Sequence, residues 1–141
     1  MKYLLLTVLI FNHPTNYDCE NYGDAMRNVK AYADEAFRFC KRANDLVEKE
    51  DIKPLIKKVM ELSENTEDEG EEALIYAEKC NCHEGQKFSE RVAYLASEMF
   101  THAQKAYQTD DFDEIKYHLG RVIQDSKECL NKAKYGALEC K

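Results

Sequence analysis

The chain has 141 residues, of which 44% are apolar and 33% charged, with 5 Gly and 2 Pro. This length and composition favour one folded domain and exclude a disordered or collagen-like chain. Acidic residues number 27 against 20 Lys and Arg, so the formal charge is −7. We expect no nucleic-acid partner, because a surface of this sign repels phosphate. We also expect no transmembrane segment, because no apolar run reaches about 18 residues.

The first 17 residues are typical of a signal peptide. Lys2 supplies a positive charge before the apolar run Tyr3–Phe11, and Pro14 ends the pattern. The run is too short to anchor in a bilayer but suits the apolar region of an export signal. We therefore expect residues 1–17 to direct export to the periplasm or the medium, although no A-x-A-like cleavage site follows. The alternative is a strand or a segment that caps the core of a cytosolic protein.

From Tyr22 to Leu138 the apolar residues recur at helical spacing, in four stretches without strand-like alternation. Four helices of about 25–30 residues with short connections predict an all-α fold, an elongated antiparallel up-down-up-down four-helix bundle. It is expected to occupy residues 18–141 as one domain. The side chains expected to face its core include Tyr22, Met26, Val29, Val47, Ile52, Ile56, Ser63, Thr66, Gly70, Val92, Met99, Ile115, Leu119 and Ser126.

Two helix starts carry capping signals. Asp51 is expected to cap the second helix, with Pro54 in its first turn, where a missing N–H costs little. Asp111 and Glu114 have the spacing of a capping box before the fourth helix. Gly70 lies in register with the buried stripe of the second helix and is interpreted as a position of close packing.

The chain also resembles itself when it is shifted by 63 residues. The matched pairs lie on two helices and the turn between them, and they include Ala33 with Ala96, Phe37 with Phe100, Lys53 with Lys116 and Cys19 with Cys82. We interpret this as a duplicated helical hairpin, residues 19–80 and 82–140. Chance matching of two amphipathic patterns is the alternative.

A Cys near the expected mature start, Ala- and Tyr-rich helices, a Cys-x-Cys at the midpoint and a terminal Cys together define a pattern over residues 19–140. In this the chain resembles a group of small exported helical-hairpin repeat proteins of Gram-negative bacteria. The resemblance implies an exported helical bundle of unknown function and brings no activity.

Four of the six cysteines fall roughly 42–46 Å from the hairpin turns and so share one end of the bundle: Cys19, Cys80, Cys82 and Cys140. In an exported protein, convergent cysteines predict disulfides. The repeat favours Cys19–Cys80 with Cys82–Cys140. Cys19–Cys82 with Cys80–Cys140 is the alternative, and Cys80–Cys82 is disfavoured by loop strain.

The two remaining cysteines, Cys40 and Cys129, lie on apolar stripes at depths that differ by about 13 Å, which exceeds the reach of a bridge. We expect both to be buried and reduced.

Two clusters of potential metal ligands are present, but metal binding is the less favoured interpretation of each. Cys80, Cys82 and His83 with a further cysteine could hold zinc, although Cys-x-Cys is not the usual spacing. Weak candidates also lie on the third and fourth helices at i, i+4 spacing: Glu98, His102, Glu114 and His118. The two histidines could lie at one height, but His118 shares a heptad position with Asp111 and Asp125, so we expect it to face water. No metal and no other cofactor is therefore favoured.

Acidic residues cluster in one run of the second helix: Glu61, Glu64, Glu67, Asp68, Glu69, Glu71 and Glu72. A solvated face is the first interpretation and a weak patch for a partner the second, because a helix cannot fold seven carboxylates around one ion. The sequence Asp110-Asp111-Phe112-Asp113 is likewise interpreted as a cap in preference to a calcium site.

Motifs for catalysis are absent: the sequence has no nucleophile elbow, no phosphate-binding Gly loop and no supported Cys–His pair. The aromatic residues at helical spacing are expected in the core and not around a ligand cavity. We therefore predict an exported, non-enzymatic helical bundle that acts as an interaction or structural module for an unidentified protein partner. A carrier of a small ligand or a metal is the alternative, and no oligomeric state is assigned.

Overall fold

Four long helices make up most of the chain described by the computed structural model, which covers residues 16–141. They are α2 (Asn16–Asp45), α3 (Lys49–Lys79), α4 (His83–Gln108) and α5 (Phe112–Gly136). No strand occurs within residues 16–141. The all-α class is therefore confirmed. The expected signal peptide lies outside the described residues except for its last two positions, which already belong to α2.

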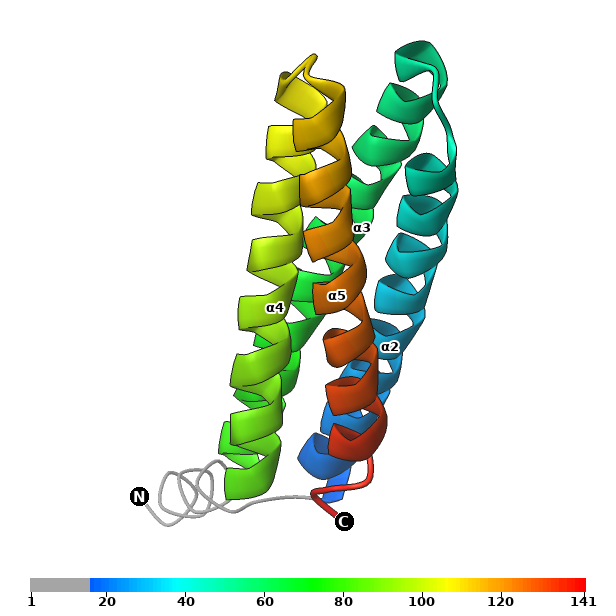
Figure 1. Cartoon of the computed structure of the whole chain (residues 1–141). Coiled ribbons are helices and arrows are strands. Elements are labelled where there is room, and N and C mark those ends of the chain that lie inside the picture. The colour runs from blue at the N-terminus through cyan, green and yellow to red at the C-terminus, as the bar shows by residue number, and fades with distance from the viewer. Residues whose placement is uncertain (1–15) are drawn as a thin grey trace, which may run out of the picture.

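The helices form an antiparallel up-down-up-down bundle (Figure 1). Each helix packs against the next one in the chain, and α5 packs back against α2 to close the ring. The three connections are short, and this forces sequential helices to lie side by side. The expected elongated four-helix bundle is confirmed. Within residues 16–141, no helix is both long and apolar enough to cross a membrane.

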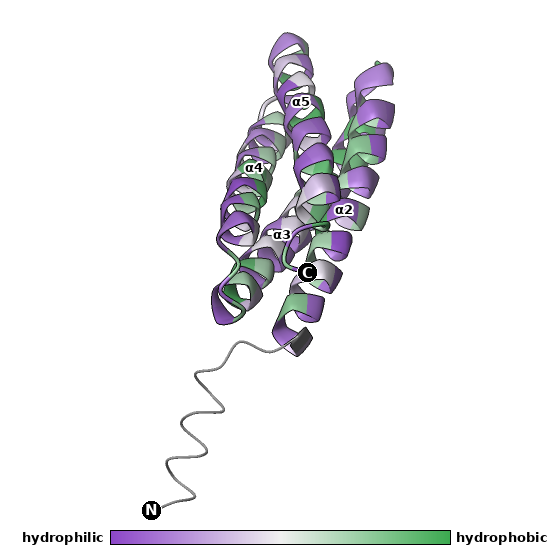
Figure 2. Cartoon of the chain, turned by 90° about the horizontal axis from the view of Figure 1, so that it is seen from below, coloured by the Kyte–Doolittle hydropathy of each residue, from purple (hydrophilic) through white to green (hydrophobic). Residues whose placement is uncertain are grey.

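The core follows the apolar stripes that the sequence predicts. In Figure 2 the hydrophobic surfaces of the helices lie mainly toward the bundle interior. The largest side chains in this core are fully buried and include Tyr22, Met26, Ile52, Ile56, Leu95, Met99, Ile115 and Leu119. Val47 is the exception to the prediction, because it lies in the connection between α2 and α3 and is 73% exposed.

Hydroxyl groups on the buried stripes bond back to their own helices. Ser63 Oγ donates to the Val59 carbonyl at 2.7 Å, and Thr66 Oγ1 donates to the Leu62 carbonyl at 2.6 Å. Such back-bonding satisfies a buried hydroxyl without a partner on another helix. These side chains can therefore face the core, as predicted.

Gly70 brings α3 and α4 close together. A Cβ atom at this position would lie 3.2 Å from both the Ala93 nitrogen and Val92 Cγ2. These distances are tight for a carbon, so the absence of a side chain lets the two helices approach. The interpretation of Gly70 as a packing position is confirmed.

The start of α3 differs from the prediction. Its N-cap is Glu48, whose side chain makes no capping bond, and the backbone nitrogens of Asp51 and Ile52 both donate to the Glu48 carbonyl at 3.1 Å. Asp51 thus lies in the first turn, where its charge complements the helix dipole, and Pro54 lies further inside. The prediction of Asp51 as the cap was wrong because α3 begins at Lys49, two residues before Asp51.

The start of α5 agrees with the prediction for Asp111, but the capping box is only half formed, because the Asp111 nitrogen donates to Thr109 Oγ1 at 3.2 Å and not to Glu114. Asp111 is the N-cap, and its Oδ1 accepts from the Glu114 nitrogen at 3.1 Å. The Glu114 carboxylate accepts from the Thr109 hydroxyl at 2.7 Å, which ties the preceding connection to the first turn of α5.

Two lysines join the hairpins at the turn end of the bundle. Lys53 of α3 donates to the carbonyls of Ala106, Tyr107 and Thr109 at 3.0, 2.5 and 2.5 Å, at the end of α4. Lys116 of α5 reaches the end of α2, where it donates to the carbonyls of Asn44 and, at 2.9 Å, Leu46. Each ammonium group thus satisfies carbonyls that a helix end leaves without partners.

Candidate functional site

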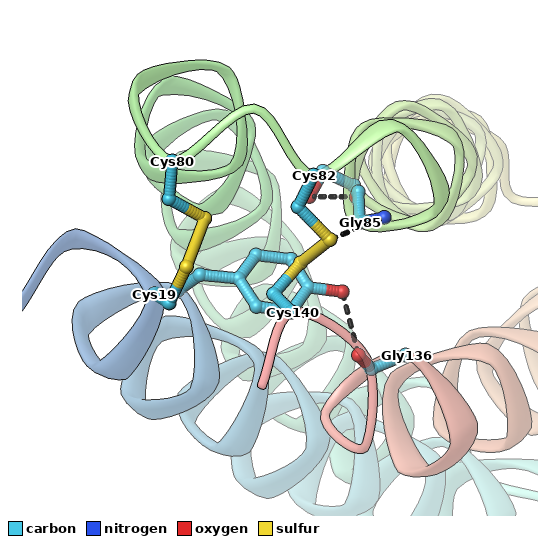
Figure 3. The surroundings of a disulfide bond; sticks show 8 residues. Cys19, Cys80, Cys82, Gly85, Gly136 and Cys140 are labelled. Carbon is cyan, nitrogen blue, oxygen red and sulfur yellow. Dashed lines mark hydrogen bonds between the residues drawn. A yellow bond between two sulfur atoms is a disulfide. The ribbon is translucent and has the colours of Figure 1, made fainter. Parts of the chain in front are cut away.

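Two disulfides close the end of the bundle opposite the hairpin turns (Figure 3). Cys19 is bonded to Cys80 and Cys82 to Cys140, with Cα–Cα distances of 5.6 and 5.4 Å. The favoured pairing is confirmed. The alternative zinc site is contradicted for these cysteines, because a sulfur atom within a disulfide is not a thiolate ligand, and the remaining member of the set, His83, is exposed.

The sequence between the bridges explains their placement. Asn81 adopts a positive φ of 56°, which turns the chain sharply between α3 and α4. Cys82 is the N-cap of α4, and its sulfur accepts from the Gly85 nitrogen at 3.3 Å. A Cβ atom at Gly85 would overlap the sulfur of Cys140. The first turn of α4 is therefore shaped around the second bridge.

Tyr22 lies close to this bridge, with its ring next to Gly85. Its ring is fully buried, and its hydroxyl donates to the Gly136 carbonyl at 2.6 Å, which joins the first turns of α2 to the last turn of α5. Burial and the nearby Glu139 raise the pKa of this phenol. It is therefore a neutral structural donor at physiological pH.

The two remaining cysteines, Cys40 and Cys129, are buried and free, as predicted. Cys40 Sγ donates to the Leu119 carbonyl at 3.3 Å, and Cys129 Sγ points to the Val92 carbonyl at 3.9 Å. Burial raises the pKa of both thiols to about 12. Both are protonated at neutral pH, which makes them poor nucleophiles.

His102 of α4 and His118 of α5 contact each other through their Nδ1 atoms, 2.9 Å apart. The expectation that the two histidines lie at one height is confirmed, but His118 is half-buried and does not simply face water. Burial lowers the pKa of both rings; mutual repulsion adds to this at His102, and Lys105 adds to it at His118. In the neutral pair one nitrogen donates and the other accepts.

The two glutamates of the weak metal set point to other partners. Glu98 accepts from the Tyr94 hydroxyl at 2.9 Å, and Glu114 accepts from Thr109. In the described part of the chain, no group of three or more His, Cys, Asp or Glu side chains is arranged to hold a metal ion. The structure thus brings His102 and His118 together but does not gather the full set of four.

A polar depression lies between α4 and α5, with a volume of about 430 Å³. We call it the α4–α5 depression, and it is lined by Arg91, Tyr94, Leu95, Glu98, Arg121, Gln124, Asp125 and Glu128. Arg91 Nη2 donates to both carboxylate oxygens of Glu128, at 3.0 and 2.8 Å. Sequence reasoning did not find this site.

Asp125 is the unexpected member of the depression. It is only 6% exposed, and its Oδ2 atom has no hydrogen-bond partner. The heptad comparison that placed it on a water-facing line was wrong. A straight α-helix drifts by about 20° per heptad relative to a 3.5-residue repeat, so Asp111, His118 and Asp125 do not share one environment.

The seven carboxylates of α3 form a surface that we call the acidic face. Within it Glu67 and Glu69 are half-buried and the others are exposed. In residues 16–141 the one ion pair that reaches this face joins Lys58 to Glu61, at 3.5 Å. Burial and the neighbouring acidic residues Glu71, Asp68 and Glu64 raise the pKa of Glu67. The carboxylates of the acidic face therefore repel one another.

The aromatic side chains on the predicted apolar stripes are only partly inside the core. Among the described aromatic residues Tyr22 is the one that is fully buried. Phe37, Phe88 and Phe100, which lie on the predicted apolar stripes, are half-buried. Several tyrosines outside those stripes are exposed at the surface: Tyr17, Tyr94, Tyr107, Tyr117 and Tyr135.

Comparison of the chain with protein-family models, with curated proteins and with solved structures finds no match.

Proposed function

We propose that this protein is an exported, non-enzymatic interaction module whose acidic face binds a basic surface of a protein partner. The observation that carries the proposal is the concentration of carboxylates on α3 with almost no compensating charge. No Lys or Arg occurs between Val59 and Glu78. Among the described residues only the Lys58–Glu61 pair offsets the repulsion between these groups, and a basic partner would relieve the rest.

Export is supported by the disulfides and by the apolar start of the sequence. Disulfides persist in oxidising compartments such as the periplasm and the extracellular medium. The resemblance to exported repeat proteins of Gram-negative bacteria points in the same direction. Intact-mass measurement of the protein from its own host tests this part: we expect the loss of residues 1 to about 17, and a cytoplasmic chain that still begins at Met1 would contradict it.

A non-catalytic role is supported by the state of the reactive side chains. Four cysteines are disulfide-bonded, and the other two are protonated, buried thiols. Nucleophilic catalysis by cysteine requires a thiolate that substrate can reach. A carrier of a small ligand remains the second candidate, and the observation that favours it is the α4–α5 depression.

Crosslinking in the native host tests the role of the acidic face. A photo-reactive residue replaces Asn65, which is exposed within that face, and in a second protein replaces Lys30, which is exposed on α2. We expect a discrete crosslinked partner from position 65 and not from position 30. The same partner from both positions, or from neither, would contradict the proposal.

Two charge variants provide the matched comparison. The first changes Glu61, Glu64, Asp68 and Glu71 to Gln or Asn, and the second does the same at Glu20, Glu35, Asp45 and Glu90, which are exposed elsewhere. Both remove four negative charges. Only the first is expected to lose the crosslinked partner, and binding by the second should weaken as salt is raised. Equal loss in both would indicate a dependence on net charge alone.

A further inference from the structure

His102 and His118 form a contact that depends on the protonation of both rings. Their Nδ1 atoms are 2.9 Å apart. The ring centroids are 5.2 Å apart, which is close to the largest separation that two rings with such an N–N contact can have, so the two nitrogens face each other directly. A hydrogen bond between them needs one Nδ1 that carries a hydrogen and one that does not. We call these two residues the histidine pair.

The surroundings of the histidine pair orient one ring and admit solvent. The Tyr117 ring packs edge-on against the His118 ring, with the centroids 5.1 Å apart. His118 also lines an open depression of about 590 Å³ beside the connection from α4 to α5. Both histidines are half-buried and not enclosed in the core. The pair can therefore exchange protons with solvent while the bundle stays folded.

The charged groups that face the histidine pair do not neutralise it. Among the described residues they all lie on α4 and α5: Lys105 and Arg121, which are positive, and Glu98 and Glu114, which are negative. Glu98 accepts from Tyr94 and Glu114 accepts from Thr109. Neither carboxylate forms an ion pair with a ring within residues 16–141. A charge that develops on the rings is therefore left without a direct partner.

The neutral pair can bind two protons, and the two have different effects. The first binds Nε2 of the donating ring, and the imidazolium that results still donates from its Nδ1, in a charge-assisted bond. The second must bind the Nδ1 that accepts, because the Nε2 of that ring already carries a hydrogen. Both facing nitrogens are then protonated, and two positive rings repel each other. The titration therefore has two steps, which belong to the pair and not to either residue.

We propose that the histidine pair is an acid-sensitive switch, which joins α4 to α5 at neutral pH and releases this contact once the second proton is bound. The contact lies within about two turns of the end of α4 and of the start of α5. Its loss should loosen the turn of the second hairpin, while the core and the disulfides at the opposite end keep the bundle folded. The switch does not involve the acidic face, so its test is independent of the proposed function.

The direct test is NMR of the disulfide-bonded protein with isotope-labelled histidine. Above about pH 7.5 we expect a scalar coupling between the two Nδ1 nuclei, which is transmitted only through a hydrogen bond, and two titration steps below the ordinary value of about 6.5. The coupling should persist through the first step and vanish in the second. The same protein unfolded in urea is the reference and should show one step. One step in the folded protein, or no coupling at the higher pH, would overturn the proposal.

The double variant His102→Asn with His118→Asn should be unable to switch, because an Asn side chain places an amide near the position of Nδ1 and does not ionise. His83→Asn, at the exposed start of α4, is the control. Burial lowers the pKa of both rings in the folded state, so the unfolded chain binds protons more tightly. The melting temperature of the parent and of the control should therefore fall, relative to the double variant, from about pH 7 to about pH 5. A difference that does not change with pH would contradict the switch.

Hydrogen exchange distinguishes a loosened hairpin from rings that only turn away. At about pH 5 the amides of residues 102–108 and 112–118 should be less protected in the parent than in the double variant, and at about pH 7.5 equally protected in both. Residues 19–26, near the bridges, should be equally protected at both values. Equal protection of the two hairpin segments at the lower pH would mean that protonation moves the rings alone, and the switch would be refuted.

Discussion

At the scale of single residues, two glycines of the same bundle differ in what surrounds them. A Cβ at Gly85 would overlap the sulfur of Cys140, whereas nothing lies within 4 Å of a Cβ at Gly120. We predict that Gly85→Ala destabilises the protein by about 1–3 kcal/mol through overpacking. Gly120→Ala should stabilise it by about 0.5–1 kcal/mol through helix propensity. Urea unfolding measures both, and the same sign for the two variants would contradict the packing around the second bridge.

The buried hydroxyl of Tyr22 provides the second prediction. Tyr22→Phe removes the 2.6 Å bond to the Gly136 carbonyl and leaves that oxygen buried without this donor. The Gly136 carbonyl keeps its bond from the Glu139 nitrogen at 3.1 Å, so the expected loss of unfolding free energy is that of one hydrogen bond, about 0.5–1.5 kcal/mol. Tyr94→Phe is the control, since its bond to Glu98 is at the surface and should contribute little. A similar small loss in both variants would show that Tyr22 acts by packing alone.

Asp125 predicts a pH dependence of stability. Its folded pKa of about 6 is above the ordinary value for Asp, so the folded state binds the proton more tightly than the unfolded state. The parent should therefore gain stability, relative to Asp125→Asn, as pH falls from about 6 to about 4. Thermal unfolding of both proteins across this range measures the difference, in which the other carboxylates cancel. A difference that is constant with pH would mean that Asp125 is not perturbed.

Such residues mark the limit of what periodicity predicts. The stripes correctly placed Met26, Ile52 and Leu119 inside because an apolar side chain has one favourable environment. Asp125 and His118 are polar residues of α5 at its border with α4. At such a border, a small rotation of the helix about its axis determines whether a side chain is exposed to solvent or buried. Their positions depend on how α4 and α5 pack, which no local pattern contains.

At the scale of elements, the exchange of lysines between hairpins was not predicted, although Lys53 and Lys116 were matched by the 63-residue shift. Each caps the end of a helix in the other hairpin. This reciprocity supports the prediction of a duplicated hairpin, because a two-fold arrangement of equivalent units produces contacts in pairs. The correspondence between Lys53 and Lys116 could be predicted from the sequence. Their hydrogen-bond acceptors could not, because these are backbone carbonyls, which every residue has.

We predict that Lys53→Met and Lys116→Met each lower the unfolding free energy by about 1–2 kcal/mol, because carbonyls at the ends of α4 and α2 lose a charged donor. Lys30→Met, at an exposed position of α2, should change it by less than about 0.5 kcal/mol. Hydrogen exchange adds a local measurement: the last turn of α4 should open faster in the Lys53 variant and the last turn of α2 in the Lys116 variant. Loss of protection at the same helix in both would contradict the reciprocal arrangement.

At the scale of the whole molecule, helix lengths predicted the fold and the meeting of four cysteines, because a rise of about 1.5 Å per residue fixes where each helix ends. The connections were less predictable. Asp51 has the chemistry of a cap, yet α3 begins at Lys49. An error of two residues at a helix start changes the predicted length of a long helix only slightly. The same error changes which residue is the N-cap.

The two bridges give the prediction that involves the whole chain. They connect residues 61 and 58 positions apart, and closing loops of this length constrains the unfolded chain by roughly 4 kcal/mol each. Under denaturing, non-reducing conditions a thiol reagent should count two free thiols, Cys40 and Cys129. Reduction should lower the melting temperature markedly but preserve most of the helical signal, because the bundle has an extensive core of its own.

The double variants Cys19→Ser with Cys80→Ser, and Cys82→Ser with Cys140→Ser, should each lose part of this stabilisation. Peptide mapping that links Cys40 to Cys129 would contradict the structure, since Cys40 contacts Leu119 of α5 whereas Cys129 contacts Val92 of α4.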